Sequence, residues 1–192
     1  VPGHGTPPDA QTNVFGKHTT HFCVADAAGN WVSCTQTINT TFGSGVVVPG
    51  TGVVLNNEMD DFAAQPGAPN YFGLLGTEAN SVAAGKRPLS SMSPTIVLKD
   101  GEPVFAIGAA GGPTIITQVL QGLVNHIDLQ LPLSECLSRP RQHHQWMPDR
   151  LLVEPSLAQG LQDALKKKGH TLGFRKALGA SQALQKHPDG RF

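Results

Sequence analysis

Thr19 carries a hydroxyl group, which can act as a nucleophile when a neighbouring base takes its proton, and it precedes two stretches with further hydroxyl groups at Thr20, Ser33, Thr35 and Thr37. After it, residues 20–25 place the apolar Phe22 and Val24 at every second position, and residues 31–39 alternate in the same way. A period of two predicts a pair of β-strands, each with an apolar face and a polar face. Threonine is common in strands for its β-propensity alone, so an ordinary hydroxyl-rich face is the simpler alternative.

The turn between the two strands decides which residues pair. The connecting loop suits a three-residue turn with Gly29 in the left-handed conformation, which pairs Asp26 with Asn30. In that register Thr37 lies opposite Thr19, and directly opposed residues have Cβ atoms roughly 4.5–5.5 Å apart. We therefore expect the hydroxyl groups of the two threonines to be within hydrogen-bond reach.

Five longer motifs follow along the chain, at residues 17–26, 39–43, 55–62, 86–95 and 108–112. In their order and spacing they resemble the γ-glutamyltranspeptidase family of N-terminal-nucleophile hydrolases, over about residues 12–192. The fold that this resemblance implies is α/β, a four-layer αββα N-terminal-nucleophile hydrolase sandwich with a mixed, largely antiparallel core. This chain would be part of that sandwich, the subunit that bears the nucleophile.

The resemblance implies that the chain is cut immediately before Thr19. Residues 1–18 are then the tail of a large subunit, and residues 19–192 are a small catalytic subunit that we expect to be truncated at its C-terminus. Thr19 would attack the carbonyl carbon of His18, and water would cleave the resulting ester. The freed α-amine, with a reference pKa of about 7.7–8.0, would serve as base near neutral pH. An uncut chain, whose nitrogen is still an amide, should be inactive.

Polar residues in three of the motifs are implied by the resemblance to bind an amino-acid substrate. Asn39, Glu58 and Asp61 would hold the α-ammonium group of a γ-glutamyl substrate, since two carboxylates and an amide oxygen suit a cation with three N–H donors. Ser90 and Ser91 would bind its α-carboxylate. Because consecutive residues of a strand point in opposite directions, we expect an irregular backbone at this pair. Without the neighbouring motifs, these residues would be interpreted as solvated acids and a polar turn.

Residues 103–125 predict a strand, a glycine loop and a helix that begins near Pro113. Backbone N–H groups at a helix N-terminus suit a developing oxyanion, and we assign this role to Gly111 and Gly112. A dinucleotide site begins in a similar way, but no acidic residue closes a following strand about 20 residues further on.

The remaining pattern predicts several supporting elements. Residues 43–52 are expected to be a turn or loop, 53–55 a short buried strand, and 63–80 a loop that matches a lid of bacterial-type family members, with Phe72 where some carry tyrosine. Further elements are expected as follows: a hairpin over 95–107, a short helix over 133–137, an amphipathic helix over 157–168, and one more strand region over 170–187 after a turn at 177–182.

Composition limits the class of protein. With 192 residues, zero net charge and no basic run, the chain suits one sizeable core and argues against nucleic acid as a partner. No apolar run approaches the length of a membrane span. Cys23 and Cys34 project to opposite faces in the predicted register, so no disulfide is expected between them.

Metal binding is only weakly supported. The adjacent His143 and His144 lack a third ligand nearby, which favours a packed or hydrogen-bonded pair. The acids at residues 58–61 lack the glycine that a calcium loop requires. We expect neither a metal nor an organic cofactor.

The resemblance implies acyl transfer by Thr19 from glutathione or a related γ-glutamyl compound to water or an amine. The expected partners are that small molecule and the large subunit of the same precursor, and the resemblance implies a periplasmic or secreted location. Three alternatives remain: a glutaryl or cephalosporin-type acylase of the same superfamily, a non-catalytic homologue that is never cut, and an unrelated metal hydrolase that uses the acidic and histidine clusters.

Overall fold

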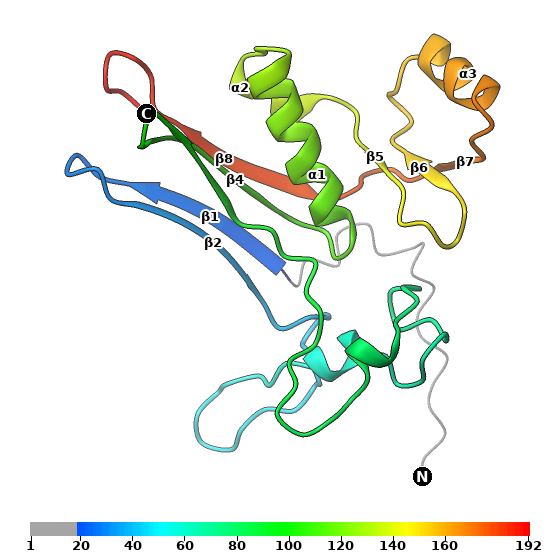
Figure 1. Cartoon of the computed structure of the whole chain (residues 1–192). Coiled ribbons are helices and arrows are strands. Elements are labelled where there is room, and N and C mark those ends of the chain that lie inside the picture. The colour runs from blue at the N-terminus through cyan, green and yellow to red at the C-terminus, as the bar shows by residue number, and fades with distance from the viewer. Residues whose placement is uncertain (1–18) are drawn as a thin grey trace.

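Two β-sheets pack face to face, and helices cover the outer side of one of them (Figure 1). The computed structural model describes residues 19–192, so the predicted large-subunit tail and His18 lie outside the described residues. The first sheet is an antiparallel hairpin of β1 (Thr19–Ala25) and β2 (Trp31–Thr37). The second is antiparallel with the order β3-β4-β8, and its strands are β3 (Thr95–Lys99), β4 (Glu102–Ala110) and β8 (Ala180–Gln185).

The β1–β2 hairpin has the register that the turn predicts. Asp26 N–H donates to the Asn30 carbonyl over 3.1 Å, and Gly29 has a φ of +88°. Thr19 is consequently the partner of Thr37 in the ladder. The expected hairpin is confirmed, although its second strand, expected over residues 31–39, ends at Thr37.

Strand β4 is the centre of the fold because it is buried on both faces. Phe105, Ile107 and Ala109 belong to the core cluster shared with helix α1. The small residues between them turn toward the hairpin, where a Cβ on Gly108 would lie 2.2 Å from ring atoms of His21. Only glycine allows the two sheets to approach this closely.

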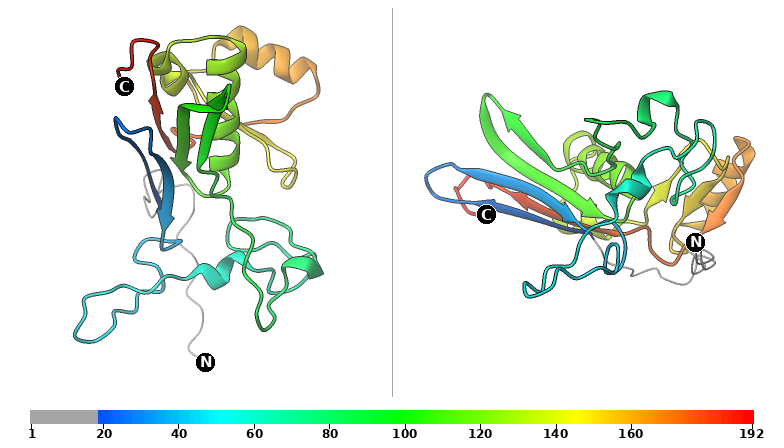
Figure 2. Two further views of the ribbon diagram at one scale, coloured as in Figure 1. Left: turned by 60° about the vertical axis from the view of Figure 1, so that its left-hand side comes forward. Right: turned by 90° about the horizontal axis from the view of Figure 1, so that it is seen from below.

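Helices α1 and α2 lie on the far side of β4 and β8 from the hairpin (Figure 1). Figure 2 shows the same layers from two further directions. Their bounds are α1 (Thr114–Leu123), continued by the π-helical turn η3 (Val124–Asp128), and α2 (Leu133–Ser138). The described residues thus form a mixed α/β structure in which a helical layer and two sheets follow one another.

A smaller sheet lies beyond α1, with α3 connecting two of its strands (Figure 1). Strand β6 pairs antiparallel with β5 and parallel with β7. The bounds are β5 (Gln142–His143), β6 (Leu151–Val153), α3 (Gln159–Lys167) and β7 (Leu172–Phe174).

Residues 38–94 connect the two main sheets almost without regular structure. Their two helical turns are η1 (Glu58–Asp61) and η2 (Glu78–Asn80). The expected buried strand at 53–55 is wrong, because Val53 is 54% exposed and Leu55 43% exposed, with an isolated bridge from Val54 to Val47. These apolar side chains have no covering layer among the described residues.

The end of the chain also differs from expectation. The predicted turn at 177–182 is too long, because β8 begins at Ala180 and pairs with β4 along its whole length. The region 170–187 contributes two strands to different sheets rather than one. Among the helices of residues 19–192, none is long and apolar enough to cross a membrane.

Candidate active site

The hydroxyl groups of Thr19 and Thr37 are hydrogen-bonded to each other, with their oxygens 2.9 Å apart. The oxygen of Thr37 also accepts the backbone N–H of Asn39 at 2.9 Å. The predicted contact between the two threonines is thereby confirmed. Thr37 joins the candidate nucleophile to the first residue of the expected ammonium site.

His21, next on the same face of β1, is engaged elsewhere. Its Nδ1 lies 2.8 Å from the hydroxyl of Thr35, and its Nε2 lies 3.1 Å from the Cys23 sulfur. The side chain is buried, and burial lowers the pKa of the ring. A neutral ring with both nitrogens occupied by Thr35 and Cys23 is not available as the base for Thr19. Alternation predicts that His21 and Thr35 share a polar face, but not that this face is the buried one.

Gly111 and Gly112 form the loop that joins β4 to α1, with φ angles of +149° and +59°. A Cβ on Gly111 would lie 2.5 Å from Thr114 Oγ1 and 2.8 Å from Gln118 Nε2, so only glycine fits. The glycine itself is exposed although its surroundings are packed. Its backbone is therefore accessible to a bound molecule.

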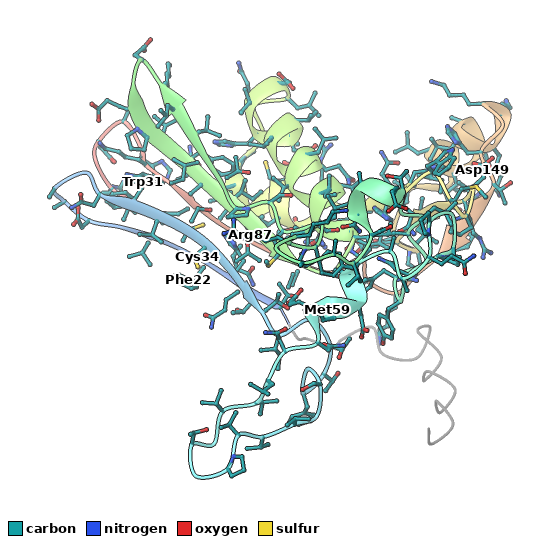
Figure 3. All side chains as sticks on the ribbon, turned by 60° about the horizontal axis from the view of Figure 1, so that its bottom comes forward. Phe22, Trp31, Cys34, Met59, Arg87 and Asp149 are labelled. Carbon is teal, nitrogen blue, oxygen red and sulfur yellow. The ribbon has the colours of Figure 1, made fainter. Side chains whose placement is uncertain are left out.

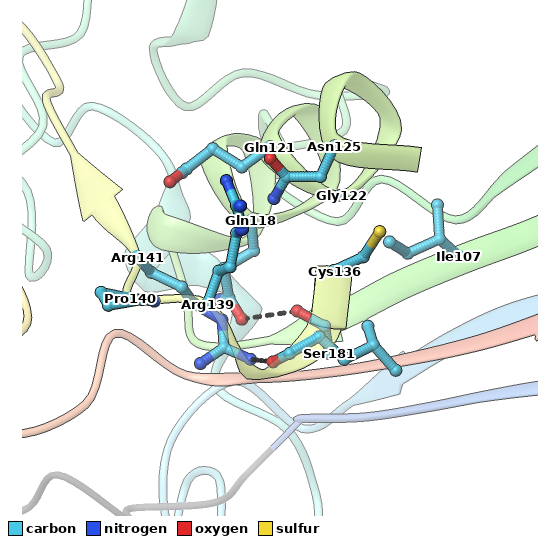
Figure 4. Close-up of a pocket in the computed structure, with 11 residues that line it drawn as sticks. Ile107, Gln118, Gln121, Gly122, Asn125, Cys136, Arg139, Pro140, Arg141 and Ser181 are labelled. Carbon is cyan, nitrogen blue, oxygen red and sulfur yellow. Dashed lines mark hydrogen bonds between the residues drawn. The ribbon is translucent and has the colours of Figure 1, made fainter. Parts of the chain in front are cut away.

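The side chain of Gln118 holds the strands behind this loop through two hydrogen bonds. Its Nε2 donates to the Ala110 carbonyl at 3.2 Å. Its Oε1 accepts the hydroxyl of Ser181 at 3.0 Å (Figure 4). The side chain thus connects the ends of β4 and α1 with β8. The adjoining cavity between α1 and α2 has a volume of about 10 Å³, which suits one water molecule and no substrate.

The start of β1 and the end of β4 lie at the same end of the two packed sheets, as Figures 1 and 2 show. Thr19 opens β1, and the glycine pair follows directly after β4. The contact of His21 with Gly108 fixes how these two strands are stacked. The topology therefore brings the candidate nucleophile and the candidate oxyanion donors to one edge of the sandwich.

Asn39 is buried, adopts a φ of +74° and donates through Nδ2 to the Asn57 carbonyl at 3.1 Å. This bond attaches the end of β2 to η1, the turn that carries both acids. The side chain of Asn57 in turn accepts the Thr40 N–H at 3.1 Å and donates to Asp60 at 2.7 Å. Asn39 and the acidic turn are thereby joined through one asparagine that the sequence analysis did not select.

Burial and the neighbouring carboxyl group of Glu58 raise the pKa of Asp61 to about 7. The two carboxyl groups lie on the same turn, so the negative charge of Glu58 disfavours ionisation of Asp61. With a pKa of about 7, Asp61 is partly protonated at neutral pH. A cation placed between Glu58 and Asp61 would displace that proton and stabilise both carboxylates.

Ser90 and Ser91 lie in a segment without regular structure that precedes β3, as their expected role requires. Asn80 connects this segment to the acidic turn. Its Nδ2 donates to the Asp61 carbonyl at 2.9 Å, and its Oδ1 accepts the Leu89 N–H at 2.9 Å. Asn80 was missed from the sequence, where the one available signal is a loop asparagine, a residue type that often bonds to nearby backbone.

The histidine pair is hydrogen-bonded within the protein. His144 contacts Asp149 at 3.1 Å through Nε2 and accepts the Trp146 N–H at 3.1 Å through Nδ1. His143 is buried between Thr117 and Gln145. Within residues 19–192 no three metal-ligating side chains gather at one place.

Comparisons with known proteins find relatives that belong to one family. A family profile described as gamma-glutamyltranspeptidase matches residues 6–192. The glutathione hydrolase proenzyme of Escherichia coli (strain K12) is 50% identical over 174 residues, covering 91% of this chain and 30% of that protein. The chain thus spans about 30% of the length of this relative.

Solved structures agree. An acivicin-inhibited gamma-glutamyltranspeptidase matches with a TM-score of 0.85 and 48% identity, covering 88% of this chain and 90% of the other. A mutant of the Helicobacter pylori gamma-glutamyltranspeptidase matches with a TM-score of 0.85 and 46% identity, covering 89% of this chain and 94% of the other. Because the profile match extends over nearly the whole sequence, this chain belongs to the gamma-glutamyltranspeptidase family.

Proposed function

We propose that the full-length protein transfers or hydrolyses the γ-glutamyl group of glutathione and related compounds, using Thr19 as an N-terminal nucleophile. One observation carries the proposal: the Thr37 oxygen bonds both the Thr19 hydroxyl and the N–H of Asn39, each at 2.9 Å. This contact couples a candidate nucleophile directly to a candidate substrate-binding residue. The relative from Escherichia coli, named a glutathione hydrolase proenzyme, supports both the substrate class and the cut.

Activation is autocatalytic cleavage between His18 and Thr19. The Thr19 oxygen attacks the His18 carbonyl carbon, the C–N bond breaks, and water hydrolyses the ester that forms. The product has a free α-amine on Thr19, a base of suitable pKa near neutral pH. The α-amine of Thr19 must serve as the base in turnover, because His21 is already bonded to Thr35 and Cys23. Division at this point gives a large-subunit tail (1–18) and a small subunit (19–192).

Turnover uses the hydroxyl group and the freed α-amine of Thr19. The α-amine takes the Thr19 hydroxyl proton as the oxygen attacks the γ-carbonyl carbon, while Thr37 orients the hydroxyl. The N–H groups of Gly111 and Gly112 stabilise the oxyanion, a contribution typically worth about 10²–10³ in rate for one donor. The leaving amine departs with the proton, and water or an acceptor amine then releases the glutamyl group from the ester. No metal or organic cofactor takes part.

Recognition of the donor rests on its α-amino acid group. Asn39, Glu58 and Asp61 receive the ammonium, whose positive charge favours the ionised form of both acids. Ser90 and Ser91 donate to the carboxylate. Support comes from the hydrogen bonds through which Asn57 and Asn80 connect the segments carrying these five residues.

The large subunit is the proposed partner of the outer face of the hairpin. Phe22, Val24 and Val32 on this face are 42%, 53% and 49% exposed, and Figure 3 shows Phe22 and Cys34 turned away from β4. A covering layer from the large subunit would bury these side chains and complete the αββα sandwich. By the same family resemblance, we propose a periplasmic or secreted location.

Turnover of two chromogenic amides tests the proposed function. The full-length protein should release p-nitroaniline from γ-glutamyl-p-nitroanilide much faster than from glutaryl-p-nitroanilide, which lacks the α-ammonium group. A preference for the glutaryl compound would show an acylase instead. Activity lost on treatment with a chelator would show a metal hydrolase.

A further inference from the structure

Phe72 lies at the tip of a tight turn in the loop 63–80. The carboxamide oxygen of Asn70 accepts the N–H groups of Phe72 and Leu74, each at 3.0 Å. The ring of Phe72 lies against Gly112, where an added Cβ would be 3.5 Å from its nearest ring atom. The ring of Phe72 therefore packs against one of the two glycines of the candidate oxyanion site.

The carbonyl oxygen of Phe72 is held from another part of the chain by Gln145. The side-chain Nε2 of Gln145 donates to this oxygen at 3.3 Å and to the Met147 carbonyl at 3.2 Å. Since both acceptors are carbonyl groups, they fix which end of the carboxamide faces the loop. The other end, Oε1, lies 3.0 Å from Nε2 of His143.

His143 connects Gln145 to helix α1. Because Oε1 of Gln145 only accepts, Nε2 of His143 must carry a proton, and in the neutral ring Nδ1 then accepts from Thr117 at 2.9 Å. Gln121 bonds the backbone of Gln142 at 2.7 Å and 3.1 Å, so β5 is attached to α1 at two places. The anchor of the loop tip is therefore the same helix that carries Gly111 and Gly112 at its N-terminus.

We propose that Gln145 is a positioning residue that holds the Phe72 ring over Gly112 and so shields the oxyanion site from water. The inference rests on the proposed function for its catalytic consequence, but the contact itself does not depend on catalysis. Excluding water from this side strengthens hydrogen bonds to the developing oxyanion, since the local dielectric constant falls. Gln145 acts on the reaction through Phe72 and does not touch the substrate.

Hydrogen exchange in the full-length protein tests the contact directly. Gln145→Met removes the bonds to Phe72 and His143, and Gln145→Glu keeps the acceptor for His143 while placing an oxygen against two carbonyl groups. Loss of one or two such bonds should raise the exchange rate of amides 70–76 by roughly 5- to 30-fold. Gln145→Glu should show the larger effect. Amides of α1, residues 114–123, should keep their protection.

Gln142→Ala is the matched control, because Gln142 is an exposed neighbour whose described contacts with Gln121 use its backbone. It should leave both exchange and turnover unchanged. In the Gln145 variants, kcat/KM for γ-glutamyl-p-nitroanilide should fall by a similar roughly 5- to 30-fold. Unchanged exchange at 70–76 in both variants, or equal loss of protection in α1, would overturn the proposal.

The exchange measurement can be repeated in the uncut Thr19→Ala protein. If the Gln145 variants exchange faster than their parent at amides 70–76 but the wild-type protein shows no turnover, the positioning role is correct and the proposed function is wrong. If the wild-type protein turns over the substrate but the Gln145 variants do not change exchange at these amides, the proposed function is correct and the positioning role is wrong.

Discussion

The nucleophile and the substrate-binding residues are positioned by two different kinds of structure. Thr19 and Thr37 are opposed in a regular antiparallel ladder, where backbone geometry alone brings their hydroxyl groups together. The proposed binding residues 58, 61, 90 and 91 lie in segments held by the side chains of Asn57 and Asn80. The positions of Thr19 and Thr37 are therefore fixed by the backbone of a regular sheet, whereas the positions of the proposed binding residues depend on a few individual hydrogen bonds. Substitutions should accordingly affect the two sets of residues differently.

The largest effect should come from Thr19 itself. Thr19→Ala removes the attacking oxygen and should abolish turnover of γ-glutamyl-p-nitroanilide by the full-length protein. Thr20→Ala is the control, since Thr20 is exposed on the other face of β1 and should leave turnover largely intact. Comparable loss in both variants would indicate that the strand, and not the hydroxyl group, is what matters.

The second largest loss of activity is expected from a substitution in the loop of Gly111 and Gly112. Gly111→Ala forces the added Cβ against Thr114 and Gln118 and shifts the N–H groups, so kcat should fall by about 10²–10³. Gly85→Ala is the control for a positive φ, because Gly85 has a φ of +76° with no atom close to the added Cβ. It should lower thermal stability slightly and leave kcat unchanged. Equal kcat values for the two variants would show that the Gly111 loop does not stabilise the oxyanion.

On the binding side, Asn80→Ala should raise KM for the γ-glutamyl donor by roughly 5- to 30-fold through loss of two hydrogen bonds, with a smaller change in kcat. Asn80→Asp keeps the acceptor for Leu89 and loses the donor to Asp61, so its KM should lie between those of the wild type and the alanine variant. A fall in kcat at constant KM would place Asn80 on the catalytic side instead.

The smallest effect is a dependence of binding on pH. With a pKa of about 7, Asp61 is protonated below neutral pH, and a substrate ammonium must displace that proton. The KM for γ-glutamyl-p-nitroanilide should therefore rise roughly fivefold between pH 7 and pH 6, as linkage to one proton requires. The KM for glutaryl-p-nitroanilide should not follow. Parallel profiles for the two amides would assign the titration to another group.

The same contrast explains what the sequence could predict. The hairpin follows from alternation and one turn, which are local, so the pairing of Thr19 with Thr37 was predictable to the residue. The glycine loop and the start of α1 were predictable for the same reason. Gln145 was not, because it meets the carbonyl of Phe72 across 73 residues. Asn80 was not either, because its partners Asp61 and Leu89 lie in irregular segments where no repeating pattern sets a register.

Burial was the least predictable property. The apolar run at 53–55 suggested a buried strand, yet Val53 and Leu55 are exposed. The outer face of β1 is similarly apolar and exposed, whereas its polar face, with His21, is buried against β4. Alternation identifies two faces of a strand, but which face is covered depends on elements that a local pattern does not contain.

Intact-mass analysis of the purified full-length protein tests the central claim most directly. We expect two chains in place of one, the smaller beginning at Thr19, and a single uncut chain for Thr19→Ala. An active wild-type protein that remains uncut, or that is cut at another bond, would contradict it.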